Sequence, residues 1–416
     1  MQQEYFSQEV NRKGTLSVKW NPKAIKGIAA TEEAEPFWVA DMDFLAPPEV
    51  VKAAQQAAAS GVYGYPYAEG KEALFCAWAE ERHAWKLECK DVVISPGMLT
   101  SIAVLTELLT GEGDGVIVPL PAYQPFVRIV RNLGRNLLAW PLLYDEKSHR
   151  FSLDWEAFEE LCKQAKLLIF CSPHNPSGLT FSEEEIRRIS RIAAKHQVAI
   201  ISDEIHADLS FKAHHPLLPI ATEEGCTAVT CMAPSKTFNI AGEHFSVTLF
   251  SDDKLRLAFM RRLDQLYLGG NSFFSTTLAL SAYESGGPWL NDLLAYLQEN
   301  IAFMDAFFKE RLPKLAFIRP EASFIAFIDC SAIISLVEKD ALAFPELYDE
   351  KNSPNGGQLS RFFGLRAGVA LNDGTWFGEA YGSFVRFNYG TRKEKVASAL
   401  ERMEQAIKFL EETYIR

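Results

Sequence analysis

Short apolar runs alternate with longer amphipathic stretches over the first two thirds of the chain. The short runs have the length of strands, and the longer stretches repeat apolar positions at helical spacing. We expect helices over 47–60, 70–85, 99–110, 183–196 and 391–413, and strands at Val92–Ile94, Gly115–Pro119, Leu167–Cys171, Ala199–Ser202, Ala228–Met232 and Ser246–Phe250. Strands that alternate with helices predict an α/β fold with a largely parallel sheet covered on both faces.

The pattern changes after residue 284. Residues 284–312 predict one long helix, followed by strands at Phe324–Asp329 and Phe384–Asn388 and by the closing helix. This grouping is typical of a smaller α+β domain, and 416 residues are long for one hydrophobic core. We therefore divide the chain into an N-terminal arm (1–45) that contributes to the small domain, a large domain (46–288) and a small C-terminal domain (289–416).

Charge and composition exclude several classes of protein. The formal net charge of -12 makes nucleic acid an improbable partner, because phosphate backbones are also negative. The N-terminus has no apolar signal-like region, and no apolar run reaches the roughly 18 residues of a membrane helix. The seven cysteines are scattered without a CxxC pair, which argues against a disulfide framework or a metal site. We expect a cytoplasmic protein without a membrane partner.

A lysine and a carboxylate follow two of the expected strands. Lys236 lies in APSKTFNIAG, directly after the strand Ala228–Met232. Burial lowers the pKa of a lysine, which suits a nucleophile that forms a Schiff base, although an exposed loop lysine is the alternative. Asp203 in IISDEIHAD ends another strand, where ligands of α/β sheets bind. Its carboxylate can keep the pyridine nitrogen of a cofactor protonated, or it can cap a helix or loop.

Three more strand ends carry candidate groups. Gly97 in ISPGMLT leads into a helix N-terminus, where backbone N–H groups can bind phosphate. Tyr123 in PLPAYQPF can stack on a flat cofactor or pack in the core. Asn175 in CSPHNPSG can donate a hydrogen bond to a phenolate oxygen, and turn chemistry explains it equally well.

Arg386 stands inside the apolar strand FVRFN. A guanidinium in such a place needs an anionic partner. That partner is either a substrate carboxylate bound through two hydrogen bonds or a structural acid of the chain itself.

The order of these groups along the chain resembles the fold-type I pyridoxal-phosphate enzymes, the aspartate-aminotransferase-like superfamily, over nearly its whole length. Within that superfamily the chain looks closest to the MalY/PatB group of C–S lyases, which includes cystathionine β-lyases. The segments that carry this resemblance are WVADMDF (38–44), GVYGYPY (61–67), SPHNPSG (172–178), SDEIHADL (202–209) and SKTFNIAG (235–242).

The resemblance implies a large domain with a mostly parallel, seven-stranded sheet, a smaller α+β domain and pyridoxal phosphate as cofactor. It implies that Lys236 carries the cofactor as a Schiff base and moves the Cα proton of the substrate. The further implied roles are Asp203 on the pyridine nitrogen, Asn175 on the ring hydroxyl and beside the substrate, Tyr123 stacked on the ring, Gly97, Met98, Leu99 and Ser235 around the phosphate, and Arg386 on the substrate carboxylate. Tyr65 would reach the phosphate of a neighbouring subunit, which implies a homodimer.

The implied activity is β-elimination from a small amino acid of the cystathionine or cysteine type, giving pyruvate, ammonia and a thiol. Transamination by a class I/II aminotransferase uses the same residues and stays open, as does a cofactor-bound protein that regulates a transcription factor. Two segments depart from the relatives. Glu243 and His244 follow SKTFNIAG, where aminotransferases have an arginine two residues past the glycine, and Phe324 and Phe327 occupy a segment expected near the substrate.

Overall fold

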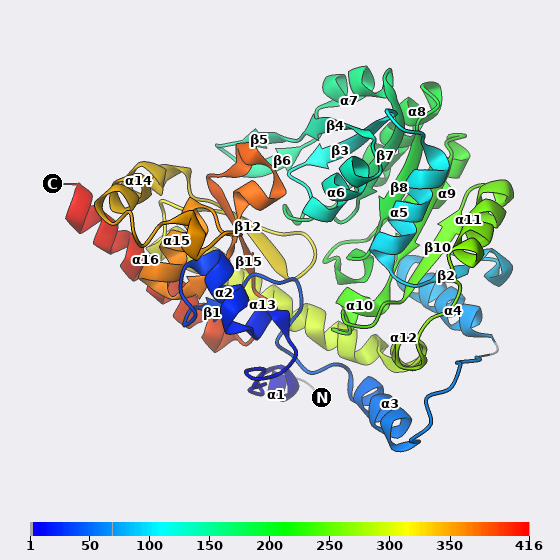
Figure 1. Cartoon of the computed structure of the whole chain (residues 1–416), viewed down its shortest axis with the longest axis horizontal. Coiled ribbons are helices and arrows are strands. Elements are labelled where there is room, and N and C mark those ends of the chain that lie inside the picture. Colours follow the sequence, from blue (N-terminus) through cyan, green and yellow to red (C-terminus); the bar gives the residue numbers. More distant parts are fainter. Residues whose placement is uncertain (1–2, 69, 416) are drawn as a thin grey trace.

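A seven-stranded sheet forms the centre of the larger half of the molecule (Figure 1). The computed structural model describes residues 3–68 and 70–415. The strands, in spatial order, are β2 (Val93–Ser95), β10 (Ser246–Phe250), β9 (Ala228–Met232), β8 (Ala199–Asp203), β7 (Ala165–Cys171), β3 (Gly115–Leu120) and β4 (Asn136–Pro141). Only β10 runs antiparallel to its neighbours, so the predicted largely parallel α/β sheet is confirmed.

Both faces of this sheet are covered, which explains why its strands read as continuous apolar runs. Leu167, Ile169 and Cys171 of β7 face one apolar cluster, whereas Leu168 and Phe170 face the other, as the two-residue period of a strand requires. The helices on the first face are α5 (Met98–Leu109), α6 (Gln124–Asn132) and α11 (Asp253–Gln265), and those on the second include α7 (Trp155–Cys162), α8 (Glu183–Lys195) and α9 (Leu217–Glu223).

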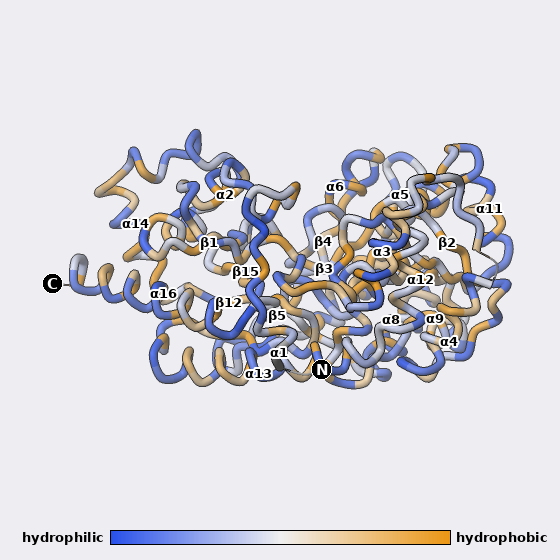
Figure 2. The backbone as a smooth tube through the Cα atoms, turned by 90° about the horizontal axis from the view of Figure 1, so that it is seen from below, coloured by the Kyte–Doolittle hydropathy of each residue, from blue (hydrophilic) through white to orange (hydrophobic). Residues whose placement is uncertain are grey.

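The smaller half is built on an antiparallel sheet of four strands. In spatial order these are β11 (Ala316–Ile318), β12 (Ile325–Asp329), β15 (Phe384–Asn388) and β14 (Asn372–Asp373). The helices of this part are α13 (Gly287–Arg311), α14 (Ile334–Ala343), α15 (Gln358–Phe362) and α16 (Lys393–Tyr414). In Figure 2, α16 alternates between hydrophobic and hydrophilic positions, as expected of a helix with one buried face.

The N-terminal segment lies beside the end of the chain. β1 (Glu35–Pro36) pairs in parallel with β13 (Val369–Ala370), and α2 (Pro22–Ala29) packs on α15. These contacts support an arm that joins the smaller half, and the division at residues 45/46 and 288/289 stays a proposal.

The remaining elements include the helices α3 (Pro48–Ala59), α4 (Lys71–His83) and α12 (Phe273–Ser285), which pack together, and otherwise shorter segments. These segments are α1 (Gln3–Phe6), η1 (Val18–Trp20), η2 (Cys89–Asp91), β5 (Leu143–Asp145), β6 (Arg150–Ser152), η3 (Ala207–Leu209), α10 (Pro234–Thr237), η4 (Ser331–Ile333), η5 (Glu350–Asn352), η6 (Phe363–Ala367), η7 (Gly374–Phe377) and η8 (Glu379–Tyr381). None of the helices in the described ranges combines the length and the apolar character needed to cross a membrane.

Two features of the sheets were not predicted. The edge strand β4 was not assigned although it contains the apolar run Leu137–Trp140, and most of its residues are exposed or half-buried. The segment between β9 and β10 contains only the one-turn α10 and no crossover helix, and β10 therefore returns antiparallel. The long helix predicted over 284–312, entered near Gly286, Gly287 and Pro288, is α13, which starts at Gly287 after α12 ends at Ser285.

Two adjacent glycines at the junction of α12 and α13 allow a stability test. A Cβ at Gly286 would lie 2.3 Å from Cε1 of Phe238, which is fully buried. A Cβ at Gly287 would meet its nearest atom, Cζ3 of Trp78, at 3.8 Å. Gly286→Ala is expected to lower the free energy of unfolding by roughly 1–3 kcal/mol, as overpacking does. Gly287→Ala is the control and should change it little, and equal denaturation midpoints for both variants would contradict the packing argument.

Candidate active site

A cavity of about 380 Å³ lies between the carboxyl ends of the central strands and the four-stranded sheet. With the exception of Tyr65, every site residue predicted from the sequence lines it. These residues are Gly97, Met98, Leu99, Tyr123, Asn175, Asp203, Ser235, Lys236 and Arg386. Segments that are far apart in the sequence therefore converge on one space.

Strand register explains most of this convergence. Cys171, Asp203 and Cys231 pair across β7, β8 and β9, so these three parallel strands end at the same level. Asn175 lies four residues beyond the end of β7, and Lys236 lies four residues beyond the end of β9. Side chains that follow level strand ends meet at one edge of the sheet, where α/β folds bind their ligands.

Lys236 stands in the one-turn helix α10 and is partly exposed to the cavity. Its Nζ donates a hydrogen bond to the backbone oxygen of Ala40 at 2.6 Å. Burial lowers the pKa of Lys236 to about 8, opposed by the charges of Asp41 and Asp203 and assisted by that of Arg386. A pKa in this range leaves an appreciable fraction of the amine unprotonated near neutral pH, which suits a group that accepts and returns a proton.

Asp203 is buried at the end of β8. Burial raises its pKa to about 7, partly offset by the hydrogen bond that the backbone N–H of Ile205 donates to Oδ1 at 3.0 Å. Its other carboxylate oxygen has no hydrogen-bond partner among the described residues. A cationic N–H group entering the cavity would satisfy that oxygen and stabilise the ionised form of the carboxylate.

Arg386 is buried in β15 and makes no ion pair with a described residue. Its Nη1 donates to Oδ1 of Asn175 at 3.1 Å, and its Nη2 donates to the Trp38 oxygen and to Oδ1 of Asn372, both at 2.7 Å. Nε has no partner, and burial lowers the pKa of the guanidinium to about 10. The structural ion pair that the sequence left open is therefore not found, and the side chain is available to an anion from outside.

The part of the cavity beside the N-terminus of α5 suits a phosphate. Gly97 precedes α5 with a φ of 107°, a conformation that favours glycine, and the N–H groups of Met98 and Leu99 open the helix. Ser235 lines the same space, and its hydroxyl has no partner among the described residues. His244 also lies there, because a Cβ added to Gly97 would be 3.4 Å from its imidazole Nδ1.

Tyr123 contributes an aromatic wall. Its ring lies 5.9 Å from that of Trp376 at an angle of 52°, and both line the cavity. Burial raises the pKa of the Tyr123 phenol, so the ring is neutral near pH 7 and can cover a flat ligand.

Several lining residues were not assigned from the sequence. His206 is buried three residues after Asp203, its Nδ1 lies 3.0 Å from Oγ of Ser323, and burial together with nearby cations lowers its pKa to about 3. Its polar character within SDEIHADL was a signal that could have marked it. Trp38 lies in WVADMDF, one of the segments that carry the resemblance, whereas Asn372 and Trp376 carried no local signal, since contacts between distant segments bring them to the cavity.

Phe324 and Phe327 lie beside residues of the cavity, since Phe327 pairs with Arg386 in the sheet and the ring of Phe324 lies 6.1 Å from that of His206. Neither lines the cavity, and both are fully buried. Phe327 stacks on Phe384 with 4.8 Å between ring centroids, and β12 is buried along its whole length.

Tyr65 is exposed to solvent and lies outside this cavity. It is fully exposed in the segment 61–67 between α3 and α4, which Figure 1 shows as an extended connection at the edge of the molecule. A single chain therefore does not bring Tyr65 to its own candidate site.

Comparison with known proteins agrees with this geometry. Residues 37–403 match the family model described as aminotransferase class I and II. The chain belongs to this family. It is 34% identical over 409 residues to cystathionine beta-lyase PatB of Bacillus subtilis (strain 168), covering 97% of this chain and 99% of the relative.

Solved structures of the family share the fold of this chain. A PLP-bound putative aminotransferase from Clostridium difficile 630 has a TM-score of 0.87 and 31% identity, covering 97% of this chain and 99% of that one. Cystalysin from Treponema denticola, solved with pyridoxal 5'-phosphate, has a TM-score of 0.86 and 27% identity with the same coverage. The fold of this chain is that of the type I aminotransferases.

The residues of this cavity fit pyridoxal phosphate on chemical grounds. A lysine with a lowered pKa, an unpaired carboxylate and a helix N-terminus occupy separate parts of one space. They match the aldehyde, the ring nitrogen and the phosphate of that cofactor respectively.

Asp203 should make the cofactor-free protein less stable as the pH rises. Its folded pKa is about 7 against an ordinary value of 3.8, so the unfolded carboxyl ionises first and the cost of burying it grows between these values. We expect the cofactor-free Asp203→Asn variant to be more stable than wild type, by a margin that widens from pH 5 to pH 8. Urea denaturation at both values measures it. Asp264→Asn, at an exposed position, is the control, and a margin independent of pH would contradict the assignment.

Proposed function

We propose that this protein is a pyridoxal-phosphate-dependent C–S β-lyase that acts on amino acids of the cystathionine or cysteine type. The products would be pyruvate, ammonia and a thiol. The observation that carries the proposal is the convergence of Lys236, Asp203 and the unpaired Arg386 on one cavity, in a chain that matches a cystathionine β-lyase over nearly its whole length.

Each residue of the cavity has a separate task in this proposal. Pyridoxal phosphate, when bound, draws electrons from the Cα of the substrate and so allows a sulfur group on Cβ to leave with its bonding electrons. Lys236 would hold the cofactor and would take the proton from Cα with its Nζ. Arg386 would bind the α-carboxylate, for which it has no competing acid in the described chain. The burial of these groups strengthens every charge interaction that they make with the substrate.

The other lining residues would orient the cofactor. Asp203 would accept a hydrogen bond from the ring nitrogen, and the side-chain amide of Asn175 would donate one to the ring hydroxyl. Tyr123 would cover one face of the ring. The backbone N–H groups that follow Gly97, at Met98 and Leu99, would hold the phosphate together with the Ser235 hydroxyl.

Purified protein with cystathionine or cysteine should release pyruvate, ammonia and thiol in equal amounts, without any added keto acid. The reason is that elimination regenerates the cofactor in each cycle, whereas amino-group transfer needs a keto-acid acceptor. Pyruvate and thiol are measured beside keto-acid exchange in the same preparation. Exchange that depends on 2-oxoglutarate and proceeds without thiol release would identify an aminotransferase and overturn the lyase proposal.

We further propose a homodimer with a shared active site. Tyr65, Tyr67 and Val62 are largely exposed in the segment 61–67, together with the half-exposed Tyr63. A contiguous group of exposed aromatic residues is typical of a protein–protein interface. Twofold symmetry would place this segment of each chain beside the cavity of its partner.

A cytoplasmic location, expected from the sequence, also remains a prediction.

Mixed dimers test the shared site. Tyr65→Ala and Lys236→Ala, each inactive alone, should recover roughly one quarter of wild-type activity when mixed and reassociated, because half of the dimers would then hold one intact site. The control mixture pairs Lys236→Ala with Asp203→Asn. Those two changes fall in the same chain's half of the site, so no hybrid would contain an intact one. If mixed dimers form and the first pair recovers nothing, Tyr65 has no role in the partner's site.

A further inference from the structure

One wall of the cavity is the irregular segment 38–44, which contributes Trp38, Val39 and Ala40 to the lining. Its backbone is held by side chains from distant parts of the chain. Five consecutive carbonyl groups accept such bonds: Trp38 from Arg386 (2.7 Å), Val39 from Asn388 (2.5 Å), Ala40 from Lys236 (2.6 Å), Asp41 from Lys19 (3.0 Å) and Asn388 (2.7 Å), and Met42 from Arg12 (3.1 Å) and Asn239 (3.0 Å). Two of these donors, Lys236 and Arg386, belong to the proposed catalytic machinery.

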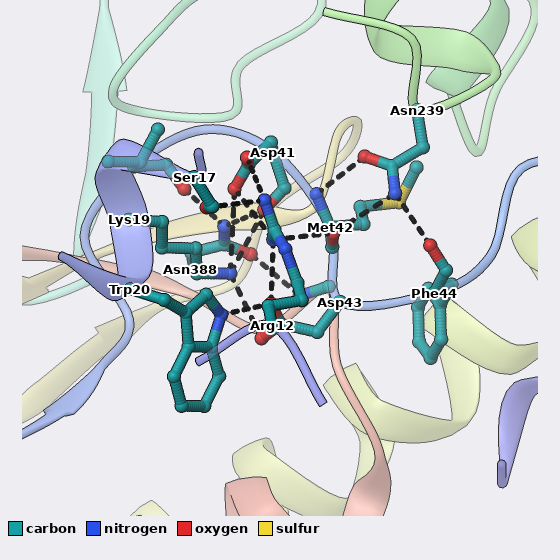
Figure 3. Close-up of polar contacts among 12 residues, drawn as sticks. Arg12, Ser17, Lys19, Trp20, Asp41, Met42, Asp43, Phe44, Asn239 and Asn388 are labelled. Atoms are coloured by element: carbon teal, nitrogen blue, oxygen red, sulfur yellow. Dashed lines mark hydrogen bonds and ion pairs between the residues drawn. The ribbon is translucent and has the colours of Figure 1, made fainter. Parts of the chain in front are cut away.

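Arg12 and Lys19 also form ion pairs with Asp41 and Asp43 of this segment (Figure 3). Arg12 pairs with Asp41 at 2.6 Å and with Asp43 at 2.8 Å, and Lys19 pairs with Asp43 at 3.1 Å. We call Arg12, Lys19, Asp41 and Asp43 the N-terminal ion cluster. It contains two cations and two carboxylates, so its formal charge balances.

The ion cluster is too enclosed to be an ordinary surface ion pair. The side chains of Lys19 and Asp43 are 1% and 4% exposed, and Nε1 of Trp20 donates to Asp43 at 2.9 Å. Burial opposes the ionised form of Asp43, but the charges of Lys19 and Arg12 outweigh it and lower its pKa. Desolvation offsets much of the attraction in such clusters, so holding a fixed geometry explains this one better than added stability does.

The ion cluster lies next to the hydrogen bond that positions the amino group of Lys236. Asp41 directly follows Ala40, whose oxygen receives Nζ of Lys236. The charge of Asp41 also favours the protonated form of Lys236, and Arg12 contacts both oxygens of that carboxylate, at 2.6 and 3.3 Å. The other charged or titratable groups that act on Lys236 are Asp203 from β8, Arg386 from β15 and His206 from the turn after β8.

We propose that Arg12 and Lys19 are positioning residues of the active site. Through Asp41 and Asp43 they hold the backbone of 38–42 where the Ala40 oxygen receives the free amino group of Lys236 and the Trp38 oxygen holds Arg386. Lys236 must release the cofactor whenever it moves a proton of the substrate, and the Ala40 oxygen then gives its amino group a fixed place. The role given to these residues rests on the proposed function, whereas their contacts are observed within the chain.

Substitutions within the cluster should move the pKa of the Lys236 nitrogen, in its Schiff base with the cofactor, in opposite directions. Arg12→Met leaves the Asp41 charge less compensated and should raise the pH midpoint of the cofactor's visible absorption band by about 0.5 unit, and Asp41→Asn should lower it by a similar amount. The double variant should return toward the wild-type midpoint. Arg12→Lys, which keeps the charge but loses the two-pronged contact, should shift it less than Arg12→Met does.

The control is the pair Arg366–Asp340, which has the same chemistry at 2.8 Å in the smaller half, with Asp340 fully buried. Arg366→Met should lower the thermal unfolding midpoint without moving the absorption midpoint. The proposal is overturned if the cluster variants behave like Arg366→Met, or if Arg12→Met and Asp41→Asn shift the midpoint in the same direction.

These readouts separate the present inference from the proposed function. The absorption midpoint is measured on cofactor-loaded protein without substrate, so it does not depend on which reaction the enzyme catalyses. If Arg12→Met fails to fold, the near-isosteric Asp41→Asn and the conservative Arg12→Lys decide the question alone. A shifted midpoint in an enzyme without C–S cleavage would sustain the inference while overturning the lyase proposal.

Discussion

Asp203 and Arg386 are buried in the same cavity, and neither has an ion-pair partner among the described residues; the rest of the site is arranged around that constraint. An uncompensated charge in a protein interior costs several kcal/mol, so a flexible scaffold would let such groups turn toward water. Here both stand on strands, Asp203 at the end of β8 and Arg386 within β15. Neutral hydrogen-bond partners hold Arg386 without cancelling its charge. The cavity consequently favours a ligand that brings a cation to one group and an anion to the other.

The two halves of the molecule supply different kinds of group. The level ends of the parallel strands provide the residues proposed to bind the cofactor, whereas the antiparallel sheet provides the guanidinium proposed to bind the substrate. Segment 38–44 joins these two sets, because Lys236 and Arg386 donate to carbonyl groups two residues apart. A displacement of this segment would therefore disturb the cofactor side and the substrate side together.

Local rules were sufficient to predict part of this arrangement from the sequence. Lys236, Asp203 and Asn175 were predictable because each follows an apolar strand, and parallel strands end at a common edge. Arg386 was marked by its place within an apolar strand. Other features depend on contacts between distant segments, such as the 348-residue separation between Arg386 and Trp38, and no local pattern encodes them. The positions of Trp376 and Asn372 are of this kind, as is the ion cluster, whose charges look like ordinary surface residues in the sequence.

The pairing of the beginning of the chain with its end has a consequence for biosynthesis. β1 completes its pairing only with β13, and the carbonyl groups of Val39 and Asp41 are held by Asn388. Lys236 is synthesised about 150 residues before Asn388, and a chain elongates on the ribosome at about 5–20 residues per second. During that interval the nascent protein contains its reactive lysine and the central strands but not the completed wall beside them. A chain that ended before β15 would keep the residues at the ends of the parallel strands. It would lose the wall whose enclosure lowers the pKa of Lys236.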